Sequence, residues 1–330
     1  MGPINIYFYI DKKGWIDKLS KAKADEYQQN YFYLASSTYH WTVQTYLRLK
    51  EHGFSCLATE TLPDEGIIVA NRFYLPDKLK PNDRQLFVHL KADNRRHPYA
   101  QLHVICNPCD PLLTQQRGGL WQAHYIPAWP QIGLIPRDPR RGNRFENIVH
   151  IGGNLAPELC TNLWKKKLNS IGLKWEMRGQ DRLNDFSDID AIVSVRSFDN
   201  RQHTNKPATK LYNAWMAGVP AVFGPESAVR AERKSEFDYF EVRSPEEAFL
   251  AVKRLKEDEG LRNKIIKNAS LRASELAPEN YVSRWKYLLT EVAPEAYEGW
   301  RSLTVRQRRV YFFRRFMEYK IEGAFLRIMR

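Results

Sequence analysis

The chain has 330 residues, enough for about two domains. Hydrophobic residues make up 43% of it and charged residues 27%, which excludes disorder over most of the chain and is typical of a globular protein. Basic residues exceed acidic ones by 13, so acidic partners such as phosphates, nucleic acids or anionic lipids are favoured, whereas no apolar run reaches the ~20 residues of a transmembrane helix.

Short apolar runs alternate with helical patterns through the first part of the chain. Most of the runs are nearly continuous rather than alternating, as in parallel strands that are buried on both faces. We therefore expect a Rossmann-like α/β domain over residues 1–137. It has a helix at 40–52 and strands at 4–10, 54–58, 66–70, 85–90 and 102–106.

A proline-rich stretch follows at 126–142. Its four prolines prevent regular secondary structure and stiffen the chain, so we interpret it as a connection between domains. After it the alternation restarts and predicts a second Rossmann-like domain over 138–290. Its expected helices are 156–170, 207–217, 245–256 and 260–275, and its expected strands are 147–151, 173–177, 191–195, 220–223 and 239–242.

The last segment, 291–330, is predicted to be a basic amphipathic helical tail. Residues 299–330 hold nine basic and two acidic side chains, which is more than half of the excess charge. The helix lies on an anionic membrane surface or packs back onto the first domain, and the two readings do not exclude each other. Apolar residues recur there at steps of three and four, with one adjacent pair, at Phe313, Phe316, Met317, Ile321, Ala324 and Ile328.

The segment 205–222 carries the clearest chemical signal. Its helix is expected to begin near Pro207, where a missing N–H has no effect on the helix. Lys206, Thr209 and Lys210 surround this start, and a helix N-terminus already presents free N–H groups and a partial positive charge. The segment also follows a strand, at the sheet edge where open α/β folds bind ligands. It therefore predicts a diphosphate site; the alternative is an ordinary helix with exposed lysines.

The pattern Lys-Pro-x-x-Lys-Leu-x-x-Ala-x-x-Ala-Gly-Val-Pro in this segment resembles the donor-site helix of nucleotide-sugar-dependent glycosyltransferases of the GT-B fold (families 4 and 1). The turn Gly152-Gly153-Asn154 resembles the glycine-containing turn of their second domain. This resemblance implies an α/β fold of two Rossmann-like domains facing across a cleft. It also implies a hexosyltransferase with a nucleoside diphosphate sugar, carrying UDP or GDP, as co-substrate.

Asn205 and Asn213 stand where many retaining members of these families carry glutamates. Asn213 is still expected to hydrogen-bond the ribose, while the inverting and retaining outcomes both stay open. Arg196 is expected to replace a basic pair of the family and to neutralise the leaving diphosphate; its alternative is a surface arginine. The nucleoside is expected near Met177 and Arg178.

The first domain is expected to supply the acceptor site and a general base. Asp93 and His97 follow the strand 85–90, and His40 lies at the first turn of the first long helix. If the reaction inverts, Asp93 is the first choice to deprotonate an acceptor hydroxyl, with His97 and His40 after it. Each has a structural alternative, as a cap, a turn residue or a packed side chain. Asn107 and Glu226 are further candidates to face the cleft.

Asp188 and Asp190 copy the metal-binding Asp-x-Asp of the other main glycosyltransferase fold, but they precede their strand. We expect a solvated turn at the amino edge and a reaction without a metal or other cofactor. Four cysteines do not make a disulfide scaffold. We therefore expect a cytoplasmic protein. The basic segment 299–330 favours a peripheral place at the inner membrane face, and the resemblance implies a glycan or lipid-linked acceptor in polysaccharide biosynthesis.

Two other functions stay open. Aromatic residues lie between arginines in 297–319, which is compatible with nucleic-acid binding, although no recognition motif is present. Asparagine at both glutamate positions is compatible with a noncatalytic scaffold that keeps the GT-B fold.

Overall fold

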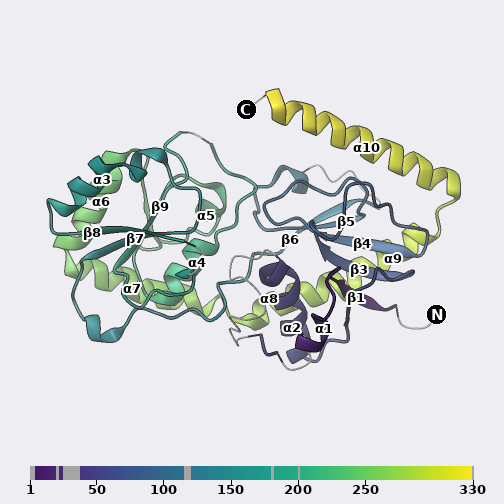
Figure 1. Ribbon diagram of the computed structural model, residues 1–330, viewed down its shortest axis with the longest axis horizontal. Coiled ribbons are helices and arrows are strands. Elements are labelled where there is room, and N and C mark those ends of the chain that lie inside the picture. The colour runs from purple at the N-terminus through teal and green to yellow at the C-terminus, as the bar shows by residue number, and fades with distance from the viewer. Residues whose placement is uncertain are drawn as a thin grey trace.

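The computed structural model describes residues 4–19, 22–24, 38–114, 120–179, 182–199 and 201–328. Figure 1 shows two α/β units side by side, each built around one sheet, with a long C-terminal helix along the outside of the first unit. Within the described ranges, no helix combines the length and the apolar character needed to span a bilayer.

The first unit holds a six-stranded parallel sheet in the order β2-β1-β3-β4-β5-β6. The two central strands, β3 and β4, are buried along their whole length, as continuous apolar runs in a parallel sheet should be. The elements of this unit are β1 (Ile6–Tyr9), α1 (Ile16–Leu19), the π-helical η1 (Thr38–Val43), α2 (Gln44–Glu51), β2 (Leu57–Thr59), β3 (Gly66–Asn71), β4 (Gln85–Leu90), β5 (Leu102–Ile105), the 3-10 turn η2 (Pro111–Leu113) and β6 (Gln122–Tyr125).

The second unit holds a five-stranded parallel sheet in the order β11-β10-β9-β7-β8. Helices cover both of its faces: α4, α5 and α7 pack in one apolar cluster, and α3 and α6 in another. Its elements are η3 (Pro139–Arg141), β7 (Asn147–Ile151), η4 (Pro157–Cys160), α3 (Asn162–Asn169), β8 (Lys174–Arg178), β9 (Ala191–Ser194), α4 (Thr209–Ala217), β10 (Ala221–Phe223), α5 (Ser227–Ala231), β11 (Phe240–Glu241), α6 (Pro245–Glu257) and α7 (Glu259–Ser274).

Local signals set several helix ends of the second unit. The hydroxyl of Ser244 accepts the N–H of Glu247 at the start of α6, and the carboxylate of Asp258 accepts the N–H of Leu261 at the start of α7. Gly218 ends α4 in the left-handed conformation, with φ 69°, which glycine adopts without strain. The strand and helix patterns predicted for this unit are confirmed within a few residues.

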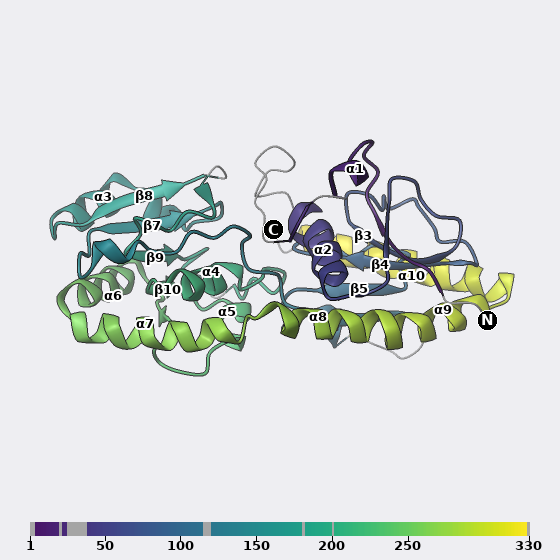
Figure 2. The same cartoon turned by 90° about the horizontal axis from the view of Figure 1, so that it is seen from below.

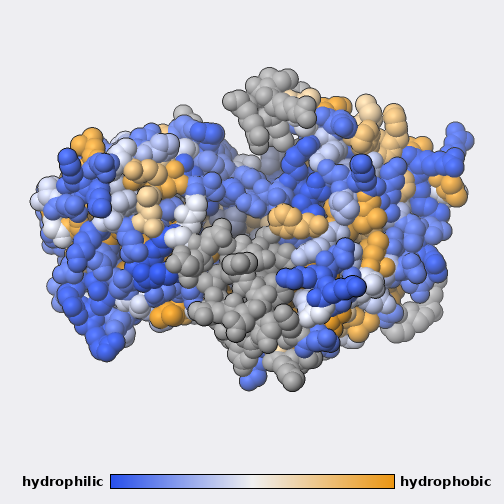
Figure 3. Space-filling model, viewed as in Figure 1, coloured by the Kyte–Doolittle hydropathy of each residue, from blue (hydrophilic) through white to orange (hydrophobic). Residues whose placement is uncertain are grey.

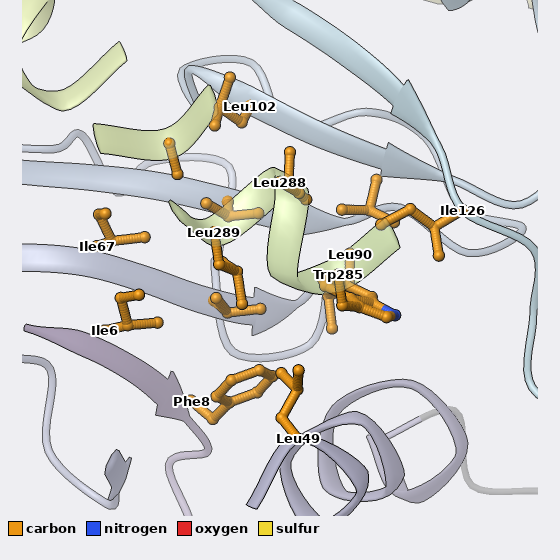
Figure 4. Packing of buried hydrophobic residues seen from close by; sticks show 14 of the residues in the cluster. Ile6, Phe8, Leu49, Ile67, Leu90, Leu102, Ile126, Trp285, Leu288 and Leu289 are labelled. Carbon is orange, nitrogen blue, oxygen red and sulfur yellow. The ribbon is translucent and has the colours of Figure 1, made fainter. Parts of the chain in front are cut away.

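After α7 the chain returns to the first unit, as Figure 2 shows along one side of the molecule. The returning elements are α8 (Pro278–Tyr287), the π-helical η6 (Leu288–Val292) and α9 (Ala293–Arg301). Trp285, Leu288 and Leu289 are buried in the core of the first sheet, where Figure 4 shows them close to Leu90 and Ile67. Residues 278–290, which the sequence predicts as part of the second domain, therefore bury their apolar side chains on the first unit.

The proline-rich connection is docked rather than free. Ile126, Ala128 and Trp129 are buried in the first unit, and Ile135 forms a bridge with Asp185 of the second unit. The main-chain N–H of Gln131 donates to the side-chain oxygen of Asn213 on α4 at 2.9 Å. The predicted interdomain connection is therefore confirmed, and it is fixed to both units.

The C-terminal helix α10 (Val305–Ile328) packs on the first unit. Tyr311 donates a hydrogen bond to the carbonyl of Ala100, and Tyr319 donates one to Asp77. The ring of Phe312 meets that of Tyr99 edge-on, with 5.5 Å between centroids. Of the two arrangements left open for this helix, packing on the first unit is observed.

Candidate functional site

The carboxyl edges of the two sheets meet at the boundary between the units. Asp93, which follows β4, accepts the amide N–H of Asn205 at its main-chain carbonyl, 3.0 Å away. Asn107, which follows β5, donates from its side-chain nitrogen to the carbonyl of Lys206 at 3.0 Å and to the hydroxyl of Ser227 at 2.9 Å. Loops after parallel strands are where α/β proteins place ligands, so these contacts locate a candidate site.

A glycine turn follows β7 on the side of the second unit. Gly152 has φ +82° and Asn154 has φ +61°, so the chain turns back through two left-handed residues. A side-chain carbon at Gly153 would meet no atom within 4 Å, and one at Gly152 would lie 4.0 Å from Cε of Lys210. The turn therefore leaves its backbone accessible next to the lysine.

Lys210 is the half-buried cation of this edge. Its Nζ donates to the hydroxyl of Ser194 at 2.9 Å and lies 3.4 Å from the carbonyl of Gly153; no ion pair joins it to a carboxylate of the described chain. Burial lowers its pKa well below the usual value, and the charges of Arg196 and Lys206 lower it further. An anion placed here would meet a cation that only neutral groups satisfy.

Thr209 and Lys210 open α4, and the residue before them, Ala208, has no side chain that caps the helix. The first N–H groups of α4 therefore lack a side-chain acceptor. Together with Lys210 and the glycine turn, they form an anion-binding arrangement of the kind that the sequence predicts.

Arg196 and Glu226 form a buried ion pair beside Lys210. Their side chains are 9% and 4% exposed. Burial lowers the pKa of Arg196 to about 10, which still leaves it charged at neutral pH. The predicted contact of Arg196 with a diphosphate therefore competes with Glu226, and its alternative as a surface arginine is wrong.

Lys206 reaches across the boundary to the other unit. Its Nζ lies 2.5 Å from a carboxylate oxygen of Asp93. Arg196 thus pairs with Glu226, and Lys206 pairs with Asp93. Among these three basic side chains of the described site, Lys210 is the one without an acidic partner.

The residues predicted to hold the nucleoside lie farther along the second sheet. Met177 is exposed near the end of β8. Arg178 is buried and donates to Glu176, Asp188 and the carbonyl of Asp185, so it holds the loop after β8 instead of facing outward.

Asn213 is buried and uses its side-chain oxygen to hold the interdomain connection. The sequence did not indicate this contact. The predicted role of Asn213 in ribose binding stays a prediction.

Of the three predicted catalytic residues, only Asp93 lies at the boundary. His97 is buried: its Nδ1 accepts the N–H groups of Tyr99 and Ala100, and its Nε2 lies 3.1 Å from the carbonyl of Pro76. Burial lowers its pKa to about 4. The structure thus gives His97 a structural role inside the loop that carries Asp93.

His40 lies in the π-helical segment at the start of the first helix, next to Trp41. Burial lowers its pKa to about 4, partly offset by the main chain of Trp129 in the interdomain connection. Its neighbours Trp41 and Trp129 belong to its own helical segment and to the connection, and neither lies in the loop that carries Asp93.

Sequence reasoning missed His150, two residues before the glycine turn. This side chain is 1% exposed, and its Nδ1 lies 3.2 Å from the carbonyl of Val193. Its Nε2 is buried without a hydrogen-bond partner in the described chain. Burial and then the charge of Lys210 lower its pKa to about 3. From the sequence alone, a histidine inside an apolar strand could equally be a packed core residue or a residue of the site.

The Asp-Ile-Asp sequence lies at the opposite, amino edge, as expected from its place before β9. Asp190 is not solvated, however: it is buried, receives hydrogen bonds from Arg137 and Arg141, and accepts the N–H of Asn147. It fixes the start of the second unit. No three His, Cys, Asp or Glu side chains of the described residues gather as metal ligands, and metal independence stays a prediction.

No family model and no curated protein matches the sequence. Among solved structures, the chain is similar to TarM, with a TM-score of 0.51 and 11% identity over 75% of this chain and 58% of that one. It is also similar to the S. aureus TarM G117R mutant in complex with Fondaparinux, alpha-GlcNAc-glycerol and UDP, with a TM-score of 0.50 and 11% identity over 75% and 59%. Anabaena HepE in complex with UDP-glucose gives 0.49 and 12% over 87% and 100%.

The chain therefore spans less than two thirds of the length of TarM. At this identity the likeness shows the fold, which is the GT-B arrangement of two Rossmann-like units. The predicted fold class is confirmed.

Proposed function

We propose that the chain is a glycosyltransferase of hexosyltransferase type. It moves a sugar from a nucleoside diphosphate sugar to a hydroxyl of a glycan or lipid-linked acceptor, without a metal. The observation that carries this proposal is Lys210. A half-buried lysine that only neutral groups satisfy, under an accessible glycine turn and at an uncapped helix start, fits a diphosphate.

In this proposal Lys210, Thr209 and the N–H groups of Gly153 and Asn154 hold the diphosphate, since the N–H of Gly152 already donates to the carbonyl of Arg178. Arg196 sits behind them, held by Glu226, and adds positive potential where the leaving group gains negative charge. Such fixed charges stabilise the transition state because they need no reorganisation during the reaction. This electrostatic arrangement takes the place that a metal ion has in other transferases.

Asp93 is the proposed general base. Its pairing with Lys206 holds the carboxylate at the boundary, where an acceptor hydroxyl bound to the first unit would approach. When the donor binds, Lys206 exchanges Asp93 for a phosphate oxygen, and the carboxylate is released to accept the hydroxyl proton. The nucleoside lies over the exposed Met177 and within reach of Asn213.

UDP or GDP is the proposed nucleotide. The S. aureus TarM mutant that shares the fold was solved in complex with UDP and alpha-GlcNAc-glycerol, which supports UDP as the first nucleotide to test.

The first experiment measures the unfolding temperature against UDP, GDP, ADP, CDP and dTDP. A ligand at about 100 times its Kd adds about 2.7 kcal/mol of stability, which is visible as a shift. Lys210→Met should abolish the shift, while the matched control Lys166→Met, on the exposed face of α3, should keep it. The absence of any shift in the wild type, or an equal shift in Lys210→Met, would contradict the proposed donor site.

The second experiment measures release of the nucleotide from the sugar donor that binds, with and without EDTA. Release that depends on an added glycan or lipid-linked acceptor, and that survives EDTA, supports a metal-independent transferase. Nucleotide binding without turnover would instead support the noncatalytic scaffold.

A further inference from the structure

Helix α10 turns its charged and hydroxyl-bearing side to the protein. Arg96 of the first unit donates to Glu322 at 2.8 Å, and Tyr319 donates to Asp77 at 2.7 Å. The guanidinium of Arg315 lies 4.0 Å from the ring centre of Trp121 and pairs with Glu318 on its own helix. The inner face is thus held by aromatic contacts and paired charges.

The outer face of α10 carries an apolar stripe. Val310, Phe313, Met317 and Ile321 recur at steps of three and four, and so lie on one side of the helix. They are 60%, 69%, 43% and 52% exposed. Tyr311 and Phe312 already pack inward on the first unit, so this stripe is a second apolar face, which a helix that only closed a soluble core would not need. Figure 3 shows hydrophobic side chains among hydrophilic ones along the edge that α10 forms in Figure 1.

Basic side chains flank the stripe. Arg306, Arg309 and Lys320 are exposed, and no ion pair joins them to an acidic side chain of the described chain. Arg314 is also exposed, but it pairs with Glu318. The face therefore offers apolar side chains in the middle and free positive charge around them, which is the pattern of a helix that lies in the plane of a membrane interface.

We propose that the outer face of α10 docks on the surface of an anionic lipid bilayer. Phe313, Met317 and Ile321 enter the boundary between headgroups and acyl chains, while Arg306, Arg309 and Lys320 meet the lipid phosphates. A second copy of the chain is disfavoured because it would set these cations against one another. A nucleic acid is disfavoured because Tyr311 and Phe312 face inward and Phe316 stacks on Tyr99. Phe313 then remains as the single outward ring in the described part of α10, and one ring is no row of stacking platforms for successive bases.

The docked helix would also position the acceptor side of the site. Arg95 donates to the carbonyl of Tyr319 at 2.8 Å, and Arg96 pairs with Glu322. Both arginines belong to the loop that carries Asp93, so α10 fixes that loop. This part of the inference rests on the proposed function: it places the general base beside the membrane surface, where a lipid-linked acceptor is presented.

The test is sedimentation of the full chain with vesicles of phosphatidylcholine alone, and with vesicles containing 30% phosphatidylglycerol, without nucleotide. We expect binding to the anionic vesicles that weakens as salt rises. The combined variant Phe313→Ser, Met317→Ser and Ile321→Ser should reduce binding by at least ~10-fold. Its matched control, Leu163→Ser, Leu250→Ser and Leu271→Ser, changes three exposed leucines of the second unit and should bind as the wild type does.

A charge variant tests the second half of the face. Arg306→Gln, Arg309→Gln and Lys320→Gln together should lower binding to anionic vesicles by roughly 100-fold, since each cation near the surface contributes on the order of 1 kcal/mol. The control Lys166→Gln, Lys264→Gln and Lys267→Gln removes the same charge from the exposed surface of the second unit.

Any one of four results would overturn the proposal. The first is that the wild type fails to sediment with anionic vesicles, and the second is that the α10 variants and their controls bind equally. The third is that the serine variant converts a dimer into a monomer, which would identify a second copy as the occupant. Tight, sequence-independent RNA binding that is lost in the charge variant but kept in the serine variant would assign the face to nucleic acid. Because no nucleotide is present, failure here leaves the donor-site test untouched, and failure of that test leaves this one untouched.

Discussion

The two carboxyl edges that meet at the candidate site belong to sheets of the same kind, but their polar groups have different partners. On the edge of the second unit, Lys210 has only neutral acceptors and the glycine turn is accessible. On the edge of the first unit, both ring nitrogens of His97 have main-chain partners, in its own loop and at Pro76, and Asn107 is bonded across the boundary. The first arrangement is ready for an anion, whereas the second is held together by the protein itself.

This difference shows which kind of site a sequence reveals. A diphosphate is recognised by charge and by N–H groups at a helix start, both of which are local features of the chain. An acceptor is recognised by shape and by groups brought together from separate loops. The donor edge is therefore visible in fifteen consecutive residues, and the acceptor edge becomes visible only when the two units are placed together.

The buried pair of Arg196 and Glu226 allows the largest test of the donor edge. Arg196→Gln leaves a buried carboxylate without its cation, and we expect a loss of about 3 kcal/mol in the free energy of unfolding. The double variant Arg196→Gln with Glu226→Gln removes both charges and should recover most of that stability. Chemical denaturation of the two variants and the wild type measures this; a single variant as stable as the wild type would show that the pair is not buried in solution.

His97 tests the opposite claim for the acceptor edge. His97→Leu removes the acceptor of two buried N–H groups, and we expect it to cost about 2 kcal/mol of stability. Because the pKa of His97 is lowered to about 4 in the folded protein, the unfolded chain binds more protons than the folded protein does below pH 6.5. The stabilising contribution of His97 is therefore complete above about pH 6.5 and is lost as the pH falls toward 4.

Denaturation of wild type and His97→Leu at pH 7.5 and pH 4.5 measures this contribution. The difference between the two proteins should be larger at the higher pH. The pH dependence of sugar transfer should be the same in the folded His97→Leu variant as in the wild type. If the variant instead lacks the fall in activity at low pH that the wild type shows, His97 is a catalytic base and the structural role is contradicted.

Lys210 gives a smaller effect of the opposite sign. Its charged form is disfavoured by burial and by Arg196 and Lys206, so Lys210→Met should make the unliganded protein more stable, by about 1 kcal/mol at pH 7. Because the pKa of Lys210 is lower in the folded than in the unfolded protein, the free energy of unfolding of the wild type rises as the pH approaches the usual pKa of lysine. The stability difference between Lys210→Met and the wild type therefore becomes smaller at high pH. Thermal unfolding at pH 7 and pH 9.5 checks this; Ser194→Ala, which keeps the charge, should show no such gain.

Much of the fold could be predicted because parallel strands are continuous apolar runs. β6 could not, because Gln122 and His124 interrupt its apolar pattern at the sheet edge. The sequence alone could not show which unit α8 packs on, since Tyr281, Val282 and Trp285 give it an apolar face that fits either core. Only packing decides that it belongs to the first unit.

The candidate site divides in the same way. Lys206, Thr209 and Lys210 could be found because one helix start brings them together. Arg178 is held by carboxylates within ten residues of it, but the sequence does not show that its loop folds back over it. The contact of Asn213 with the interdomain connection depends on a partner 82 residues away. His150 was missed because the sequence of an apolar strand does not show which of its buried residues lies beside Lys210.

The pair of Asp93 and Lys206 is the smallest and sharpest test, because it joins the two edges directly. The pair is partly exposed, so Asp93→Asn should change the free energy of unfolding by less than about 1 kcal/mol and nucleotide affinity by only a few-fold. If Asp93 is the general base, transfer should fall by 100-fold or more, with KM for the donor nearly unchanged. The matched variant Lys206→Met breaks the same contact but keeps the carboxylate. If the pair is merely structural, both variants should transfer sugar at equally reduced rates. If Asp93 is the general base, Asp93→Asn should lose the transfer rate, whereas Lys206→Met should keep the rate and show a raised KM for the donor.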